Sequence, residues 1–329
     1  MASNPLISIL IPVFNAGKTL PRTLQCLSAL KGKDAEVLFV NDGSTDETCA
    51  ILEAYIGSNP EVECHLFHQT NQGVAAARNT AIENAKGQWL LFLDADDLYS
   101  NSAFDIISTE LIDSIDVLGW DWVNENGTRT RSMRQADYST PTQALINMMG
   151  GTMKWNLWLF AIRRKLIIAN NIRFIPGADM GEDMGFILKV FACSKTVRQI
   201  HLPLYRYNAS NPSSISVKMD EKRRKEVTAN LKSAESFLLQ SDFADLFRAY
   251  LPHLQLFIKL PLLIGPSQEN YRIWYSWFSE ANGFAFKNPD LPFRTRLLQW
   301  IASKQLWPAV RCYNRVYKTL YRFIENRSQ

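Results

Sequence analysis

The first hundred residues alternate between short apolar runs and longer amphipathic stretches. The apolar runs lie at 6–14, 37–40, 62–67 and 89–93. Continuous apolar runs of this length are typical of strands buried on both faces of a parallel sheet. Helical stretches separate them at 19–30, 46–56 and 74–85. The spacing of Ser44 and Glu47 is that of a capping box and predicts that the second helix starts there. Alternation of this kind predicts an α/β fold with an open sheet and helices on both faces.

Each predicted strand is followed by residues that can contact a ligand. The four endings are residues 12–15, 41–44, 71–73 and 94–97. They hold polar groups, glycine and carboxylates. Ligands bind beyond the carboxyl ends of the strands in open α/β sheets. The sequence therefore predicts a binding site at this edge.

The pattern changes after the first hundred residues. A strand-like run lies at 115–120, and a Trp-rich stretch lies at 155–160. A Gly- and Pro-containing loop at 176–181 precedes a predicted helix that runs to 191. From 216 onward the pattern is mainly helical. We therefore expect one domain at 1–215 and a helical region at 216–329.

Composition supports a folded chain with two unlike parts. The chain has 329 residues, of which 47% are hydrophobic and 21% charged, as in globular proteins of about two domains. The formal net charge of +4 is too small to indicate a nucleic-acid-binding protein. That charge is the sum of −4 for residues 1–215 and +8 for 216–329. Half of the aromatic residues also lie in the second part, so we expect the two parts to do different work.

Cysteine usage and the absence of targeting patterns indicate a cytoplasmic location. The five cysteines are scattered and form no CxxC pair, which argues against a disulfide framework and fits a reducing compartment. The run 6–14 lacks a basic flank and is too short to span a bilayer, so it predicts a strand rather than a signal peptide. His253, Lys259 and Pro261 interrupt the later apolar stretch 251–264, and no transmembrane helix is predicted.

Several common catalytic motifs are absent from the sequence. The segment around Gly17-Lys18-Thr19 lacks the first glycine of a Walker A loop, and no GxGxxG follows the first predicted strand. The four histidines have no HExxH spacing, and there is no GxSxG elbow. These absences argue against dinucleotide-binding enzymes, zinc proteases and α/β-hydrolases.

The motif Asp94-x-Asp96-Asp97 follows a buried strand. Three carboxylates within four residues repel one another, and a divalent cation would neutralise them. Mg²⁺ or Mn²⁺ takes one or two protein carboxylates and completes its shell with phosphates and water. The motif thus suits the binding of a diphosphate. Taken alone, it leaves open an acidic turn that caps a helix.

Two further strand endings carry candidate ligand-binding residues. Asp42 can accept a hydrogen bond from the imide N–H of a uracil ring, but Asn-Asp-Gly-Ser is also a common turn. Asn71 and Gly73 lead into an Ala-rich helix, where Gly73 permits a tight turn. Arg78 on that helix can reach a phosphate or the Asp cluster; an exposed Arg on an ordinary helix is the alternative.

A second pair of carboxylates lies about 85 residues beyond the Asp cluster. Glu182 and Asp183 follow the 176–181 loop and open a helix. Acidic residues are favoured in a first helical turn, which explains the pair without a function. The functional alternative is a general base that reaches an acceptor hydroxyl.

Together these motifs resemble the family-2 glycosyltransferases of GT-A fold, over about residues 5–215. The resemblance rests on five segments in the expected order: 9–15, 40–46, 71–79, 92–97 and 181–183. Leu204-Tyr205-x-Tyr207 with Ser213-Ser214 is similar to the segment that often closes the domain. The resemblance implies a Rossmann-like open mixed sheet flanked by helices, with a C-terminal, mainly helical region added.

The resemblance also implies a role for each motif residue. On the donor side, the nucleotide would contact Pro12, Phe14, Asp42, Asn71, Gly73, Arg78 and Asp94. Asp96 would bind the metal as part of the DXD motif, and Asp183 would act as the base with Glu182 assisting. Two positions depart from the family pattern: Phe14 replaces a common Tyr, and Asn41 replaces a common Asp.

The implied reaction is the inverting transfer of one sugar by a metal-dependent hexosyltransferase. The donor would be a nucleotide-diphospho sugar with UDP preferred, and residues 1–100 would bind it. Residues 101–215 would bind a saccharide or lipid-linked glycan acceptor in cell-surface polysaccharide synthesis. The QxxRW motif of processive synthases is absent. Two other hypotheses stay open: an inactive nucleotide-sugar-binding scaffold and a nucleotidyltransferase.

The C-terminal segment predicts a basic amphipathic helix. After Pro308, aromatic and aliphatic residues recur at helical spacing, and basic residues recur on nearly the opposite face. Residues 291–329 hold eight basic residues and one acidic residue, Glu325. Such a helix suits an anionic membrane surface, which would make the protein peripheral on the inner face of the membrane. A helix packed on the rest of the protein is the alternative.

Overall fold

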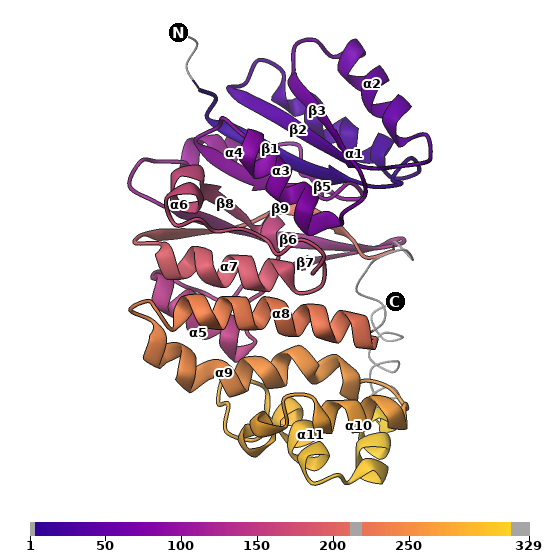
Figure 1. The fold of residues 1–329 in the computed structure, drawn as a ribbon, viewed down its shortest axis with the longest axis vertical. Coiled ribbons are helices and arrows are strands. Elements are labelled where there is room, and N and C mark those ends of the chain that lie inside the picture. Colours follow the sequence, from indigo (N-terminus) through magenta and orange to yellow (C-terminus); the bar gives the residue numbers. More distant parts are fainter. Residues whose placement is uncertain (1–3, 211–218, 317–329) are drawn as a thin grey trace. The chain divides into compact units, whose positions relative to one another are not determined.

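The protein is described by a computed structural model that covers residues 4–210 and 219–316. Within these residues one mixed sheet has the order β3-β2-β1-β4-β8-β6-β9-β5, with β7 added beside β6 (Figure 1). Its strands are β1 (Ile7–Val13), β2 (Ala35–Asp42), β3 (Glu63–Gln69), β4 (Trp89–Phe92), β5 (Leu98–Tyr99), β6 (Val117–Asn126), β7 (Arg129–Met133), β8 (Phe160–Arg163) and β9 (Val197–Asn208). The helices before residue 240 are α1 (Leu20–Cys26), α2 (Thr48–Ser58), α3 (Val74–Asn84), α4 (Ala103–Glu110), α5 (Pro141–Gly150), α6 (Arg164–Ala169), α7 (Glu182–Cys193) and α8 (Glu221–Leu238).

The first four strands of the sheet confirm the predicted α/β alternation. β1 pairs in parallel with β2 and β4, and β2 pairs in parallel with β3. β1, β2 and β4 are almost entirely buried, as their apolar runs predict. β8 then runs antiparallel to β4, which makes the sheet mixed. The predicted open mixed sheet with flanking helices is thus confirmed.

The predicted start of the second helix is wrong. α2 begins at Thr48, and Glu47 precedes it without a side-chain cap. Ser44 Oγ instead accepts a hydrogen bond from the backbone N–H of Asn15, 2.9 Å away. The N–H of Thr48 donates to Asp46 Oδ1 at 3.1 Å. Ser44 therefore joins the ends of β1 and β2, and the capping-box spacing does not mark the helix start.

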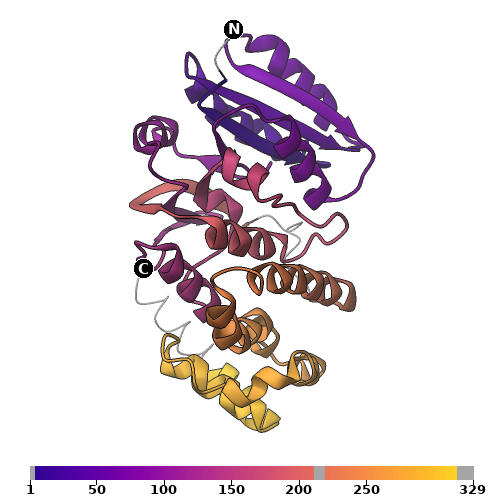
Figure 2. The ribbon, with the colours of Figure 1, turned by 60° about the vertical axis from the view of Figure 1, so that its left-hand side comes forward.

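The described chain divides into two compact units at other places than the sequence predicts. The first unit combines residues 1–144 and 155–241, and the second combines 145–154 and 242–329. The sequence placed the division at 215/216. α8 belongs to the first unit because it packs along α7, as both ribbon views show (Figure 2). A Cβ at Gly185 of α7 would lie 3.1 Å from the carbonyl oxygen of Asn230 on α8, so glycine permits this close approach.

The second unit is helical, as predicted. It contains α9 (Ala244–Lys259), α10 (Gln268–Ser276), α11 (Phe293–Ser303) and the 3-10 turns Leu260–Leu263 and Ser279–Phe284. Residues 307–316 are also helical, with Val310 fully buried and Asn314 donating to the carbonyl of Leu263 at 2.8 Å. This described part of the predicted basic helix packs on its own unit. The rest of that helix, from Tyr317, and Ser213-Ser214 lie outside the described residues.

A buried lysine joins α9 to the 279–284 turn of the second unit. The ammonium of Lys259 donates to the carbonyls of Trp277 and Phe278 at 2.9 and 3.0 Å and to Asn282 Oδ1 at 2.6 Å. It also lies 4.4 Å from the ring centre of Trp274. Burial lowers the pKa of Lys259 to about 7, and the Glu280 carboxylate opposes that shift. Three acceptors and an aromatic face favour the charged form, so this one side chain organises the turn.

No helix among residues 4–210 and 219–316 combines the length and apolarity that a membrane span requires.

We expect Lys259→Met to destabilise the protein by about 2 kcal/mol, because three partly buried acceptors would lose their donor. Urea unfolding followed by circular dichroism measures the change. Lys304→Met, at an exposed position of the same unit, is the matched control. Equal stability of the two variants would contradict this account of Lys259.

Candidate active site

The ends of β1 and β2 are tied together, as the predicted convergence of strand ends requires. The N–H of Thr45 donates to Asn15 Oδ1 at 2.8 Å, in addition to the bond between Asn15 and Ser44. Asn15 has a positive φ of 46°, so the chain turns sharply after the strand. Phe14, just before this turn, is half exposed at 51%, and Pro12 is partly buried. An exposed ring at a strand end is available for stacking on a flat ligand.

Asp42, at the end of β2, holds the loop that leads into α3. One carboxylate oxygen accepts from the N–H of Gln72 at 2.9 Å and from Gln69 Nε2 at 2.8 Å. The other accepts from the N–H of Gly73 at 2.9 Å. The Asp42 side chain is buried, and Asn71 is exposed on the loop. The structure thus assigns Asp42 a role in shaping the loop, while its contact with a base stays a prediction.

The start of α3 is capped by a residue from a distant loop, which the sequence did not predict. Gly73 precedes the helix with a φ of 91°, and the helix has no Ser, Thr, Asp or Asn at its N-cap. Asp179, from the loop before α7, supplies the missing acceptor: its Oδ1 accepts from the N–H of Ala75 at 3.0 Å. A Cβ at position 73 would lie 2.0 Å from Asp179 Oδ2. A helix without its own cap, followed later by an Asp in a glycine-rich loop, is the signal that could have indicated this pairing.

Arg78 on α3 lies at the centre of the site. Its side chain is only 4% exposed. One terminal nitrogen donates to Glu182 Oε1 and to Asp183 Oδ1, each at 2.8 Å. The other donates to Asp94 Oδ1 at 3.0 Å. The alternative of an exposed Arg is therefore wrong, and Arg78 joins the end of β4 to the first turn of α7.

Three carboxylates share this one guanidinium, so the cluster carries an excess of negative charge. Burial raises the pKa of Glu182 well above its usual range, and the neighbouring Asp183 adds to the effect. Burial also raises the pKa of Asp183, with the Arg78 guanidinium opposing and the Asp94 carboxylate adding to the shift. A carboxylate with a raised pKa is a stronger base than an ordinary one. Glu182 and Asp183 are in the first turn of α7, where acidic residues are generally favoured. Their side chains also bind Arg78, so the preference for acidic residues in a first turn does not by itself explain the pair.

The 94–97 turn divides its carboxylates between two tasks. Asp97 is buried and accepts from the hydroxyl of Tyr205 at 2.9 Å and from the N–H of Asn208 at 2.6 Å. Burial raises the pKa of Asp97 well above its usual range, with Asp94 and Asp96 contributing. Tyr205 Oη also accepts from the N–H of Asp94 at 3.2 Å. Asp97 therefore fixes the turn against β9.

Asp94 and Asp96 remain as half-buried carboxylates on this turn. Oxygen ligands of this kind suit Mg²⁺ or Mn²⁺, which need only one or two protein carboxylates. The surrounding carboxylates outnumber the one guanidinium of Arg78, so a divalent cation would reduce their mutual repulsion. The residues present thus fit the predicted metal, and the assignment of Asp96 as its ligand stays a prediction.

The Trp-rich stretch 155–160 lies beside Asp183. The Trp158 ring stacks on Tyr205 with ring centres 4.5 Å apart and on Tyr207 with ring centres 5.6 Å apart. The N–H of the preceding Leu157 donates to Asp183 Oδ2 at 3.2 Å. The core aromatics therefore fix the residue that orients Asp183.

Asn230 on α8 holds the loop that carries Asp179. Its Nδ2 donates to the carbonyls of Ala178 and Met180 at 2.9 and 3.0 Å. Asn230 is buried, and nothing in its sequence neighbourhood indicated this role. α8 thus holds the loop that leads into Glu182. This helix lies beyond residue 215, where the sequence predicted that the catalytic domain ends.

We expect Glu182→Gln to raise the free energy of unfolding at pH 7. Glutamine can still accept the Arg78 hydrogen bond, and it is neutral without taking up a proton. The folded protein keeps the Glu182 proton at pH values where the unfolded chain has released it. Stability therefore falls as the pH rises from the ordinary glutamate range, about 4.3, toward the raised pKa.

Urea unfolding at pH 5 and pH 7 measures this effect, with Glu83→Gln on the exposed side of α3 as the control. The variant should gain more at pH 7 than at pH 5. A Glu182→Gln protein that is less stable than wild type at pH 7 would contradict this prediction.

The family model and the related proteins that match this chain all indicate one family. A model of the Glycosyl transferase family 2 matches residues 8–181. The chain is 27% identical over 240 residues to the uncharacterized glycosyltransferase EpsJ of Bacillus subtilis (strain 168), covering 69% of each chain. It is 30% identical over 223 residues to the uncharacterized glycosyltransferase YibD of Escherichia coli (strain K12), covering 65% of this chain and 64% of that one.

Solved structures share the fold. The S. aureus TarS 1-349 structure in complex with UDP-GlcNAc superposes with a TM-score of 0.69 at 19% identity, covering 95% of this chain and 91% of that one. The mannosyltransferase PcManGT from Pyrobaculum calidifontis, in complex with GDP-Man and Mn²⁺, gives a TM-score of 0.54 at 16% identity, covering 95% and 84%. With more than half of its residues matched by the family model, the chain belongs to glycosyl transferase family 2.

Proposed function

We propose that the protein is a metal-dependent, inverting glycosyltransferase that moves one sugar from a UDP-sugar to a hydroxyl of a saccharide or lipid-linked glycan. The observation that carries the proposal is the shared guanidinium of Arg78. It brings Asp94, from the donor-side turn, and Asp183, at the start of α7, onto the same side chain. A donor-binding group and a base are thereby held together.

The donor would bind along the ends of β1, β2 and β4. Phe14 offers an exposed ring to the base, and the loop that Asp42 holds would border the nucleotide together with Asn71 and Gly73. Asp96 would hold Mn²⁺ or Mg²⁺, and the cation would stabilise the negative charge on the departing nucleoside diphosphate. The ligands named for TarS and PcManGT, UDP-GlcNAc and GDP-Man with Mn²⁺, support this donor class.

Asp183 would take the proton of the acceptor hydroxyl as that oxygen attacks the anomeric carbon. Its oxygens accept from Arg78 and from the Leu157 N–H, which orients the carboxylate and leaves lone pairs for a proton. The raised pKa of Asp183 suits this step, because a general base is most effective when its pKa is near the working pH. Arg78 would stay paired with Asp94 and Glu182 whether or not Asp183 carries the proton.

We expect Asp96→Ala and Asp183→Asn to separate donor binding from transfer. Asp96→Ala should lose the part of UDP affinity that depends on Mn²⁺, because it removes the proposed ligand. Asp183→Asn should bind UDP as wild type does and transfer about 10²- to 10⁴-fold more slowly, the usual contribution of a general base. Titration calorimetry with Mn²⁺ or EDTA and an assay of UDP release measure both.

Asp113→Ala, at a side chain that is 98% exposed, is the matched control for both variants. In wild type, transfer should fall on the acid side at a pH above the ordinary aspartate range, since the base must lose its proton. Normal turnover by Asp183→Asn would overturn the base assignment. Mn²⁺-dependent UDP binding by Asp96→Ala would overturn the metal assignment.

The basic second unit supports a location on the inner face of the membrane, where a lipid-linked acceptor would be found. Residues 291–329 carry eight basic residues against one acidic residue. Exposed apolar side chains within this segment include Phe293, Trp300 and Leu306. Basic groups beside interfacial aromatics favour an anionic lipid surface.

We expect the protein to co-sediment with vesicles that contain anionic lipid at low salt and to be released at high salt, because the attraction is screened. Vesicles of neutral lipid are the control. Failure to bind anionic vesicles at low salt would remove the membrane proposal and leave the catalytic proposal intact.

A further inference from the structure

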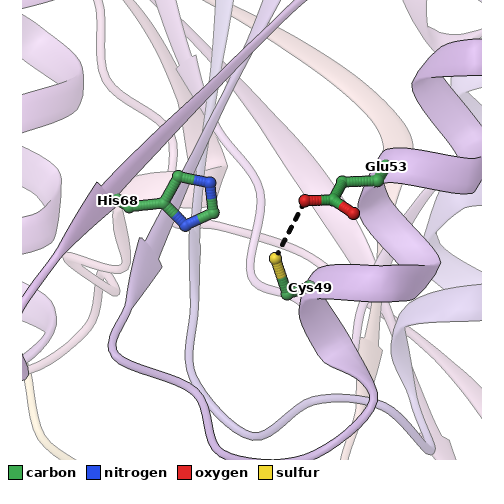
Figure 3. Close-up of side chains that lie close together, drawn as sticks. All are labelled: Cys49, Glu53 and His68. Atoms are coloured by element: carbon green, nitrogen blue, oxygen red, sulfur yellow. Dashed lines mark hydrogen bonds between the residues drawn. The ribbon is translucent and has the colours of Figure 1, made fainter.

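A cysteine, a glutamate and a histidine lie close together between α2 and β3. Cys49 and Glu53 are on α2, and His68 is on β3; Figure 3 shows the three side chains pointing toward the same space. Cys49 Sγ donates to Glu53 Oε1 at 3.4 Å. One ligand atom of each residue lies within 4.8 Å of the other two. The cluster lies wholly within the first unit.

The fold itself brings these residues together. Cys49 and Glu53 are four residues apart, so they lie one above the other on one face of α2. Phe39 of β2 meets Tyr55 of α2 edge to face at 6.3 Å, which places α2 over this side of the sheet. Leu66 pairs with Phe39, and His68 follows Leu66 by two residues on the same face of β3. Strand alternation therefore turns His68 toward the helix.

The separation of Cys49 Sγ and Glu53 Oε1 suits a small tetrahedral cation. Zinc binds sulfur at about 2.3 Å and nitrogen or oxygen at about 2.0–2.2 Å, which separates neighbouring ligand atoms by about 3.3–3.5 Å. The Sγ to Oε1 distance of 3.4 Å already equals such a separation. Cys49 is half buried, while Glu53 and His68 are exposed, so an ion can enter from solvent and the two exposed side chains can adjust.

We propose that Cys49, Glu53 and His68 bind a zinc ion, with the fourth position taken by water. Binding would release the Sγ–H proton to solvent, because the thiolate is the ligand. Thiolate and imidazole favour zinc over the harder Mg²⁺ and Mn²⁺, so this site differs in chemistry from the all-oxygen Asp94 and Asp96 turn.

The His68 ring also contacts the donor side of the fold. Its Nδ1 lies 3.4 Å from Asn41 Nδ2, and Asn41 Oδ1 accepts from the N–H of Ser44 at 3.0 Å. Asn41 directly precedes Asp42. The zinc site therefore lies next to the turn at the end of β2 that shapes the proposed donor pocket, on a different set of side chains.

A second cluster, formed by residues of β2 and β3, serves as an internal comparison. His65 Nε2 lies 3.4 Å from Glu36 Oε2 and 3.2 Å from Glu63 Oε1. This imidazole already lies between two carboxylates, and the group contains no sulfur. A signal that depends on a thiolate will therefore report on Cys49 and not on this cluster.

Cobalt(II) titration of the reduced, full-length protein tests the site, because a thiolate bound to Co²⁺ gives an intense near-ultraviolet charge-transfer band. We expect one equivalent of Co²⁺ to produce the band and one equivalent of Zn²⁺ to abolish it. Cys49→Ser should remove the band, and Glu53→Gln and His68→Gln should each weaken Co²⁺ binding at least tenfold. Cys312→Ser, at an exposed cysteine of the second unit, and His65→Gln should leave the band unchanged.

A band that persists in Cys49→Ser, or its absence from wild type with excess Co²⁺, would overturn the proposal. Unchanged affinity in both Glu53→Gln and His68→Gln would do so as well. Circular dichroism of each variant shows that it is folded. The titration contains neither nucleotide nor acceptor, so its failure is distinguishable from failure of the proposed transferase activity.

Discussion

The candidate site depends on the pairing of the buried Arg78 guanidinium with three carboxylates. A charge that leaves water must be paired, and Arg78 is paired by carboxylates from two other segments, the end of β4 and the start of α7. Removing one partner of such a buried pair typically costs about 3–5 kcal/mol. Burial raises the pKa of both α7 carboxylates, the neighbouring carboxylates add to the rise, and the Arg78 guanidinium opposes it. The pairing that stabilises the cluster therefore limits the rise in basicity that burial causes.

The rest of the first unit keeps that arrangement in place. Asp179 caps α3, which carries Arg78, and Asn230 of α8 holds the loop on which Asp179 lies. Tyr205 fixes the 94–97 turn through Asp97 and stacks on Trp158, next to the Leu157 amide that orients Asp183. Asp94 and Asp183, which would contact substrate, are therefore both held by neighbouring residues of the first unit. α8 belongs to the first unit because it packs along α7 and holds this loop, although its sequence pattern is as helical as that of the segments that follow.

Much of the fold was predictable because its causes are local. Continuous apolar runs predicted β1 to β4, and the polar ends of those strands predicted the edge at which the site lies. The capping box at Ser44 failed because the backbone N–H of Asn15, in the turn after β1, binds that hydroxyl. Asp42 and Arg78 were recognised as candidates, and the Asp cluster was recognised as within reach of Arg78. The loop amides that bind Asp42 and the α7 carboxylates that bind Arg78 were not predicted, since they are about 30 and 100 residues away.

By itself, the sequence determined the alternation of elements, the family motifs and the residue types available for chemistry. Tertiary structure alone decided which carboxylates share one cation, which Asp of the 94–97 turn is buried, and which helix closes the first unit. The physical reason is that pattern depends on neighbours in the chain, whereas burial and charge pairing depend on neighbours in space. Cys49, Glu53 and His68 show this plainly: their spacing matches no metal motif, and a helix lying over a strand makes them neighbours.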